Sequence, residues 1–196
     1  MRAFAFLRWT RMMNREHALE LMHQYVSNVS LRRHMVAVEA AMRRYAKKFQ
    51  QDEEKWGIVG LLHDFDYERW PNPPQHPIEG SKILRELGYP EDVIYAILSH
   101  ADYLDAYPRV SLLDKTLYAC DELCGFIVAC AWVRPGKLDG LEPKSVKKKL
   151  KNPSFAAAVS RDDIDRGAKD LEVDLDEHIS QCIAALQTIQ AELFDT

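Results

Sequence analysis

Residues 57–67 read GIVGLLHDFDY, and this stretch joins an apolar run to an abrupt polar end. The run is the last part of a predicted helix that starts near Asp52. At its end, His63 and Asp64 place an imidazole and a carboxylate where a buried helix meets a loop, and buried polar groups need partners. We therefore expect the fold to bring further polar side chains to this point.

Apolar residues recur at helical spacing on both sides of this stretch. One helix is predicted after an Asn14 cap, and another from a Ser30 cap, with His34 on its inward face. Prolines and glycines separate further predicted helices over residues 77–87, 90–100, 112–131 and 174–193. No segment shows the alternating pattern of a convincing strand. The sequence predicts an all-α fold.

The domain organisation is predicted to be simple. Residues 1–13, MRAFAFLRWTRMM, lack the apolar core and cleavage site of a secretory signal, so we expect an N-terminal extension. Residues 14–196 are predicted to form a single domain, whose section beyond Pro135 is also helical.

Composition excludes several classes of partner. The 196 residues carry a formal charge of −4, which argues against a nucleic-acid polymer or a membrane surface as the partner. No apolar run approaches the roughly 20 residues that span a bilayer. The four cysteines form no CxxC pair and are expected to be reduced, buried thiols of a cytoplasmic protein.

The chemistry of the His63–Asp64 pair suits a metal ion. Neutral imidazole and carboxylate together bind divalent transition metals, but one pair does not complete a coordination sphere. Further ligands must come from distant positions, and His34 and Asp121 are candidates on other predicted helices. The remaining histidines His17, His23 and His178 are expected in exposed or cap-region positions.

These residues lie in contexts that carry a family resemblance. His34 in RRHMVAVE, the doublet in LLHDFDYE and Asp121 in LYACDELCGF resemble the H…HD…D signature of the HD superfamily, over about residues 14–132. The resemblance implies an HD-domain helical bundle in which His34, His63, Asp64 and Asp121 bind a metal.

Two further histidines extend the resemblance. His76 in QHPIEGSKIL and His100 in AILSHADY resemble the intervening histidines of the binuclear HDIG-type branch, which implies that Asp64 bridges two metals and that His76 and His100 hold the second. Read without the resemblance, His76 is a loop histidine beside prolines and His100 a histidine at a helix C-terminus.

The chain also departs from the HDIG-type pattern. Phe65, Asp66 and Tyr67 stand where Ile-Gly-Lys is usual, so a lysine contact to substrate phosphate is not carried over. Ala101 follows His100 and no GYP segment is present, which argues against a cyclic-dinucleotide phosphodiesterase.

The resemblance implies hydrolysis of a phosphate ester, from a nucleotide or a small phosphorylated metabolite, with one or two divalent ions of Mn, Mg, Fe, Ni or Co. Beside the ligands, Asp66 and Glu122 are candidates to orient a ligand or to donate a proton. Arg109, Lys147 and Lys148 are candidate cations for the phosphate, although a solvated helix face also explains the lysines.

Two other functions stay open at this point. An HD-fold di-iron oxygenase uses a similar ligand set, and nitrogen and oxygen donors suit iron as well as manganese. A non-catalytic module that binds a metal and senses a nucleotide would show tight binding without turnover.

Overall fold

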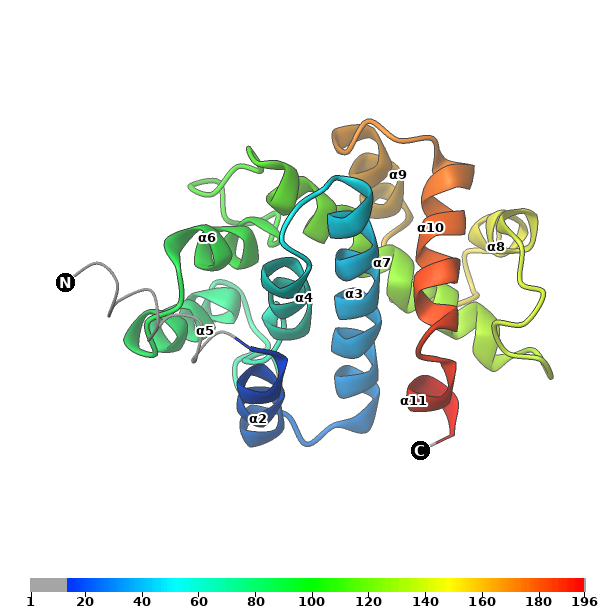
Figure 1. Cartoon of the computed structure of the whole chain (residues 1–196). Helices are drawn as coiled ribbons and strands as arrows, with labels where there is room; N and C mark the ends of the chain where they lie inside the picture. Colours follow the sequence, from blue (N-terminus) through cyan, green and yellow to red (C-terminus); the bar gives the residue numbers. More distant parts are fainter. Residues whose placement is uncertain (1–13, 196) are drawn as a thin grey trace.

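The structure is a computed structural model that describes residues 14–195, so the predicted extension over residues 1–13 lies outside the described residues. Within that range the chain forms helices and no strand, which confirms the predicted all-α fold (Figure 1). In chain order the helices are α2 (Arg15–Tyr25), α3 (Val29–Lys48), α4 (Glu53–Leu62), α5 (Gln75–Glu86), α6 (Glu91–Ser99), α7 (Leu112–Trp132), α8 (Pro143–Leu150), α9 (Arg161–Asp170), α10 (Leu175–Gln187) and α11 (Gln190–Phe194).

Helix α3 is at the centre of the fold. It packs against α4 on one side and against α7 and α10 on the other (Figure 1). Its buried face includes Met35, Val38 and Met42. The cap is Asn28 rather than the predicted Ser30, because the Asn28 side chain accepts hydrogen bonds from two backbone N–H groups of the first turn.

Helix α4 explains why the GIVGLL run is so apolar. Every residue from Trp56 to Leu62 is buried, so this helix has no solvent-facing stripe in its second half. A Cβ at Gly60 would lie 2.9 Å from the backbone of Glu39, which is closer than packed atoms approach. The backbones of α3 and α4 therefore meet at Gly60, three residues before His63.

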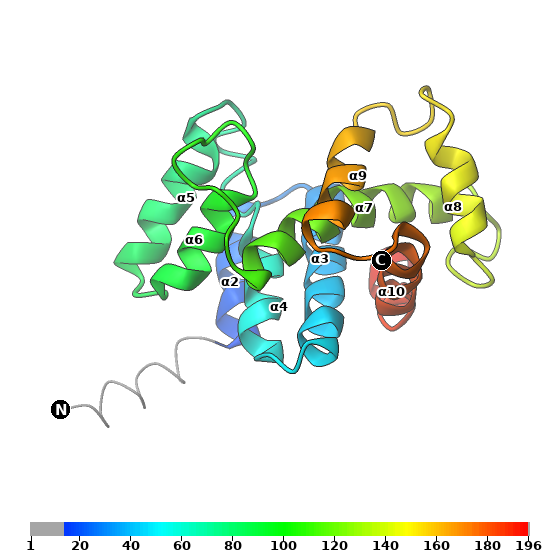
Figure 2. The ribbon, with the colours of Figure 1, turned by 90° about the horizontal axis from the view of Figure 1, so that it is seen from above.

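Helix α7 connects the two ends of the molecule. It runs from the side of α5 and α6 toward α8, and α9 and α10 pack on it (Figure 2). Ser111 starts it with a capping box, in which the side chains of Ser111 and Asp114 each accept the other's backbone N–H. This long helix therefore carries one predicted metal ligand, Asp121, and also the surface on which α9 and α10 pack.

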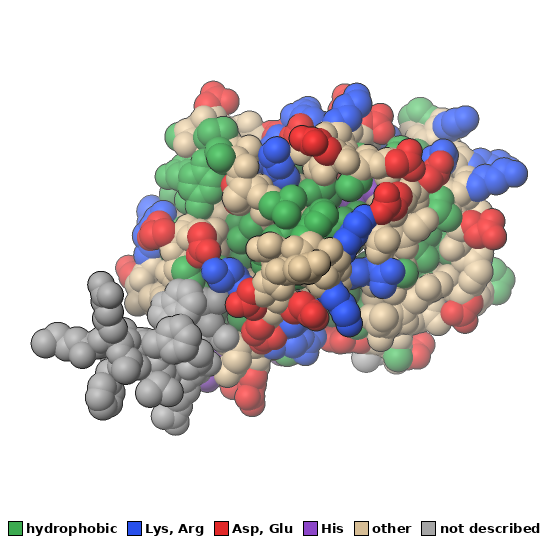
Figure 3. Space-filling model, turned by 45° about the horizontal axis from the view of Figure 1, so that its top comes forward, with side chains coloured by type: hydrophobic (Ala, Val, Ile, Leu, Met, Phe, Trp, Pro, Cys, Tyr) green, Lys and Arg blue, Asp and Glu red, His purple; other side chains and the backbone are tan. Residues whose placement is uncertain are grey.

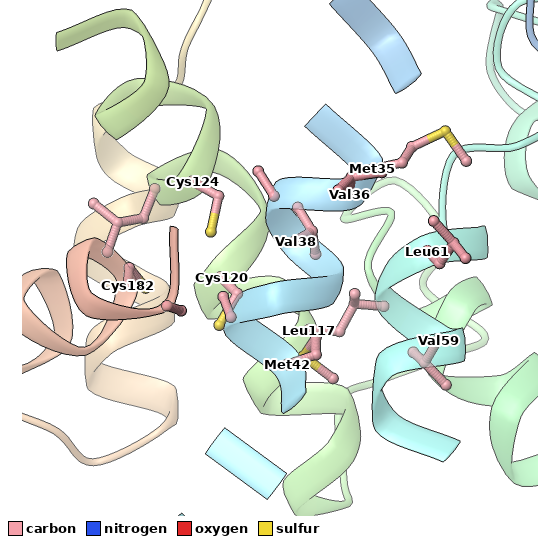
Figure 4. Close-up of a cluster of buried hydrophobic side chains, with 14 of the residues drawn as sticks. Met35, Val36, Val38, Met42, Val59, Leu61, Leu117, Cys120, Cys124 and Cys182 are labelled. Carbon is pink, nitrogen blue, oxygen red and sulfur yellow. The ribbon is translucent and has the colours of Figure 1, made fainter. Parts of the chain in front are cut away.

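The C-terminal helices complete the core on the far side of α3. Cys182 of α10 lies against Cys120 and Cys124 of α7 in the buried cluster of Figure 4. All four cysteines are buried free thiols, as predicted.

The expectation that His178 is exposed or in a cap region was wrong. Its side chain is fully buried, its Nδ1 accepts from the Tyr45 hydroxyl at 2.6 Å, and its Nε2 donates to the carbonyl of Ala119.

The surface is mixed in charge. On the face shown in Figure 3, basic and acidic side chains alternate rather than gather into one patch of a single sign. Among the described helices, none combines the length and the apolar character that crossing a bilayer requires.

Candidate metal centre

Three predicted ligands meet between α3, α4 and α7, and we name them the helix group: His34, His63 and Asp121. His34 lies within α3, His63 caps the end of α4, and Asp121 lies within α7. The two Nε2 atoms are 3.1 Å apart, and Asp121 Oδ1 lies 3.0 Å from His34 Nε2 and 3.4 Å from His63 Nε2. Three donor atoms thus converge from three separate helices.

The other three predicted ligands form a second cluster, the loop group: Asp64, His76 and His100. Asp64 follows the end of α4, His76 lies at a kink in the start of α5, and His100 caps the end of α6. The Nε2 atoms of His76 and His100 are 3.2 Å apart, and Asp64 Oδ1 lies 3.2 Å and 3.6 Å from them. These donor atoms also converge within one small volume.

Asp64 connects the two groups through its two oxygens. While Oδ1 faces the loop group, Oδ2 lies 3.5 Å from His63 Nε2 and 3.8 Å from His34 Nε2. One carboxylate therefore lies between two clusters of imidazole nitrogens.

Hydrogen bonds behind the imidazoles orient three of the four rings. His63 Nδ1 donates to the Gly60 carbonyl at 2.8 Å, and His100 Nδ1 donates to the carbonyl of Ile97. His76 Nδ1 donates to the buried carboxylate of Asp66 at 2.7 Å. Because each Nδ1 carries its proton away from the centre, each Nε2 lone pair faces inward, as in a metal-bound histidine.

Asp66 has a well-defined position behind His76. It is fully buried, and its second oxygen accepts the backbone N–H of Gly80 at 2.8 Å. A Cβ at Gly80 would lie only 2.7 Å from Asp66 Cγ, so a larger residue there would displace the carboxylate. Residue 66 therefore orients a candidate ligand, which is one of the two roles considered for it above.

The electrostatics of the centre favour bound positive charge. Burial opposes ionisation of Asp64 and Asp121, but neighbouring imidazoles, His63 foremost, hold the pKa of both carboxyls below the usual range. Burial lowers the pKa of His63 and His76, yet the adjacent carboxylates outweigh it and raise both pKa values to about 9. Protons and metal cations would compete for these nitrogens.

Comparison with known proteins identifies the segment that carries these residues. The family model for the HD domain matches residues 31–125. The chain contains an HD domain. The predicted superfamily is thereby confirmed, whereas the HDIG-type branch stays a prediction. No curated protein and no solved structure matches the chain.

All six candidate ligands belong to the HD domain. Five of them line an open pocket of about 490 Å³, and the sixth, His63, is fully buried behind them. Glu122, also in the HD domain, lines this pocket and accepts the backbone N–H of Ser160 at 3.2 Å. Burial, and then the adjacent charge of Asp121, raises the pKa of Glu122 to about 7. This side chain is therefore suited to proton transfer near neutral pH.

The predicted phosphate-binding cations are not among the described residues that line the pocket. Arg109 binds Asp102 at 2.6 Å and stacks 3.6 Å above the ring of Tyr118, behind the pocket wall. Lys147 and Lys148 lie on α8, beyond the HD domain, where Lys147 binds Asp176 of α10 at 2.7 Å and Lys148 is exposed.

Sequence reasoning missed a set of tyrosines around the HD-domain pocket. Tyr67, Tyr103 and Tyr118 line it, and the Tyr103 hydroxyl donates to the His76 carbonyl at 2.6 Å. It also missed Asp163, which reaches the pocket from α9 outside the HD domain. Proximity to a presumed ligand in the sequence could have indicated Tyr67 and Tyr103, but no local signal indicates Asp163.

Proposed function

We propose that this protein is a metal-dependent phosphohydrolase that cleaves a small phosphate ester. The observation that carries the proposal is the position of Asp64, whose two oxygens face two separate clusters of imidazole nitrogens. In this proposal, His34, His63 and Asp121 with Asp64 would hold one divalent ion. Asp64, His76 and His100 would hold the second.

The donor chemistry fits such ions. Four imidazole nitrogens and two carboxylates are a borderline donor set, which suits Mn, Fe, Co and Ni better than Mg, because Mg prefers oxygen alone. The Nδ1 atoms of His76 and His100 both donate outward, so in the neutral state of the two rings no proton lies between their Nε2 atoms, which are 3.2 Å apart, and a shared cation would relieve the repulsion. The hydrogen bonds to Gly60, Ile97 and Asp66 are the supporting contacts that metal-binding histidines usually have.

When bound, divalent ions polarise a phosphoryl oxygen and activate water for attack. The protein's own residues would perform the remaining tasks. Glu122 would donate a proton to the leaving oxygen, because its raised pKa keeps part of the population protonated near pH 7. Asp66 would fix the ring of His76, and Tyr103 would hold the backbone of the same residue. The open pocket would admit the substrate.

Elemental analysis and a substrate panel test the proposal together. We expect the purified full chain to bind up to two equivalents of divalent metal and to release phosphate from small esters with Mn, Co, Ni or Fe. The same panel is run with Fe(II) and an oxygen electrode. Oxygen consumption without phosphate release would replace the hydrolase with the di-iron oxygenase, and tight nucleotide binding without either reaction would replace it with the regulatory module.

A further inference from the structure

The loop that follows α6 begins with the candidate ligand His100 and ends at Ser111, which caps α7. A hydrogen bond back to α6 orients the imidazole ring, because His100 Nδ1 donates to the carbonyl of Ile97. The chain then leaves the helix, and the next residues with long side chains, Asp102 and Tyr103, are exposed. The position of His100 therefore depends on the contacts that hold this loop against α6.

Arg109, in the same loop, makes such contacts on both sides of His100. Its Nη1 donates to Asp102 Oδ1 at 2.6 Å and to the backbone carbonyl of Ser99 at 3.3 Å. Ser99 is the last residue of α6, and the final carbonyls of a helix have no partner within the helix. One guanidinium thus binds the residue before His100 and the residue two positions after it.

Two further contacts fix the guanidinium itself. Its central carbon lies 3.6 Å from the centre of the ring of Tyr118, which is buried in α7 one turn before Asp121. Its Nε and Nη2 atoms each lie 3.4 Å from Asp170 of α9. The Arg109 side chain is consequently only 14% exposed, although it belongs to a loop. Arg109 therefore joins the end of α6 to α7 and α9.

A second arginine nearby lacks this combination of contacts. Arg166 also binds Asp102, and it lies 3.3 Å from Asp163 on its own helix. Its contacts are with carboxylates, and its side chain is half-exposed. Arg109 differs because it binds the backbone next to a candidate metal ligand and is itself buried.

We propose, on the basis of the two-ion site in the function proposed above, that Arg109 is a positioning residue for His100 and thereby sets the metal affinity of the loop group. Without the guanidinium, the Ser99 carbonyl would lose its partner and Asp102 its shortest ion pair, so the backbone on both sides of His100 would be free to shift. This role differs from the phosphate contact considered for Arg109 from the sequence. Because Asp170 belongs to α9, the section beyond the family match would contribute to the metal site.

A metal titration of the full chain tests the inference. Mn(II) would be titrated in the presence of a competing indicator that resolves two binding steps, and His100→Ala would identify the step that belongs to the loop group. We expect Arg109→Ala to weaken that step about tenfold and to change the helix-group step less than about twofold, as for the loss of a contact that supports a single ligand. A general loss of stability would weaken both steps. Equal weakening of both steps, or no weakening, would overturn the inference.

Two further substitutions separate the geometry of Arg109 from its charge. Arg109→Lys keeps a cation for Asp102 but lacks the planar fork that reaches several partners at once, so most of the loss should remain. Arg166→Ala is the matched control, because it removes a cation from the same carboxylate without touching Ser99. It should leave both steps within about twofold of wild type, as for an exposed ion pair. Wild-type affinity in Arg109→Lys, or an equal loss in Arg166→Ala, would show that charge alone is sufficient and would overturn the positioning role.

The contribution of α9 has its own test. Asp170→Asn keeps the size of the side chain and removes the charge that Arg109 contacts, so it should weaken the loop-group step about two- to threefold, as for a partly exposed pair. Unchanged affinity would overturn the contribution of α9.

The outcome is separable from that of the proposed function. Phosphate release by the wild-type chain, with an unchanged loop-group step in Arg109→Ala, would overturn the positioning role and leave the hydrolase standing. Selective weakening of the loop-group step, without phosphate release from any ester, would overturn the hydrolase and leave the positioning role standing.

Discussion

The helix group and the loop group contain similar donors, but the fold holds them in different ways. His34 and Asp121 lie within long helices, and α3 meets α4 at backbone contact near His63. His76 and His100, by contrast, lie at helix ends, and His76 depends on one buried side chain, Asp66, for its orientation. With Asp64 shared, the helix group offers four donors and the loop group three. The comparison indicates one rigid site and one that depends on side-chain support.

Removal of the Asp64 carboxylate, which the two groups share, should abolish metal binding at both of them. We expect Asp64→Ala to lose both metal ions and at least about a thousandfold of phosphate release, because the two oxygens of Asp64 face both groups. Metal content and phosphate release would be measured on the same preparation, with circular dichroism as the check on folding. Asp162→Ala, an exposed carboxylate on α9, is the control. A variant that retained two ions would refute the bridging position.

Loss of the Asp66 carboxylate behind His76 should weaken metal binding at the loop group only. We expect Asp66→Ala to weaken metal binding about 10–100-fold at the loop group and to leave the helix group unchanged, so that stoichiometry at micromolar metal falls from two to one. A titration that follows both binding steps would measure this. Gly80→Ala, which crowds Asp66, should act in the same direction and more weakly. Equal weakening of both steps would contradict the assignment of Asp66 to one group.

The dependence on pH should be alike in the two groups. The pKa values of His63 and His76 are raised to about 9, so in the metal-free protein each group carries a proton below that pH. Metal must displace this proton, so apparent affinity should fall about tenfold for each pH unit below about 9. Indicator competition at a series of pH values measures both slopes. Affinity that rose as the pH was lowered would contradict the protonation of these imidazoles.

The smallest effect should come from the lysines of α8. The double variant Lys147→Ala/Lys148→Ala should change kcat/KM less than about twofold and affect neither metal site, because both residues lie away from the pocket and the Lys147–Asp176 pair is half-exposed. Arg109→Ala should change kcat/KM more than the lysine variant does, since Arg109 stacks on Tyr118, which lines the pocket. A large rise in KM for the lysine variant would restore the phosphate role considered for them.

The six candidate ligands were predicted mainly from the resemblance to the HD superfamily, and the structure brings them into two groups of three that Asp64 connects. The sequence did not predict the pocket wall. Besides Asp102, Arg109 also pairs with Asp170, which lies 61 positions further along the chain, and no local pattern reveals this second partner. In the sequence, Asp163 is an ordinary acidic residue in the first turn of a helix. Only the packing of α9 on α7 brings it to the pocket. His178 was misjudged for the same reason: its partner Tyr45 lies 133 positions away.

The packing of α10 has a practical consequence for anyone who wishes to produce this HD domain alone. A truncated polypeptide ending at residue 125, where the family match stops, would leave the side of α3 and α7 that α10 covers exposed to water. Tyr45 would lose His178, and the thiols of Cys120 and Cys124 would face solvent. An exposed apolar surface of this kind promotes aggregation. Expression plasmids should therefore encode the complete run of helices through α11.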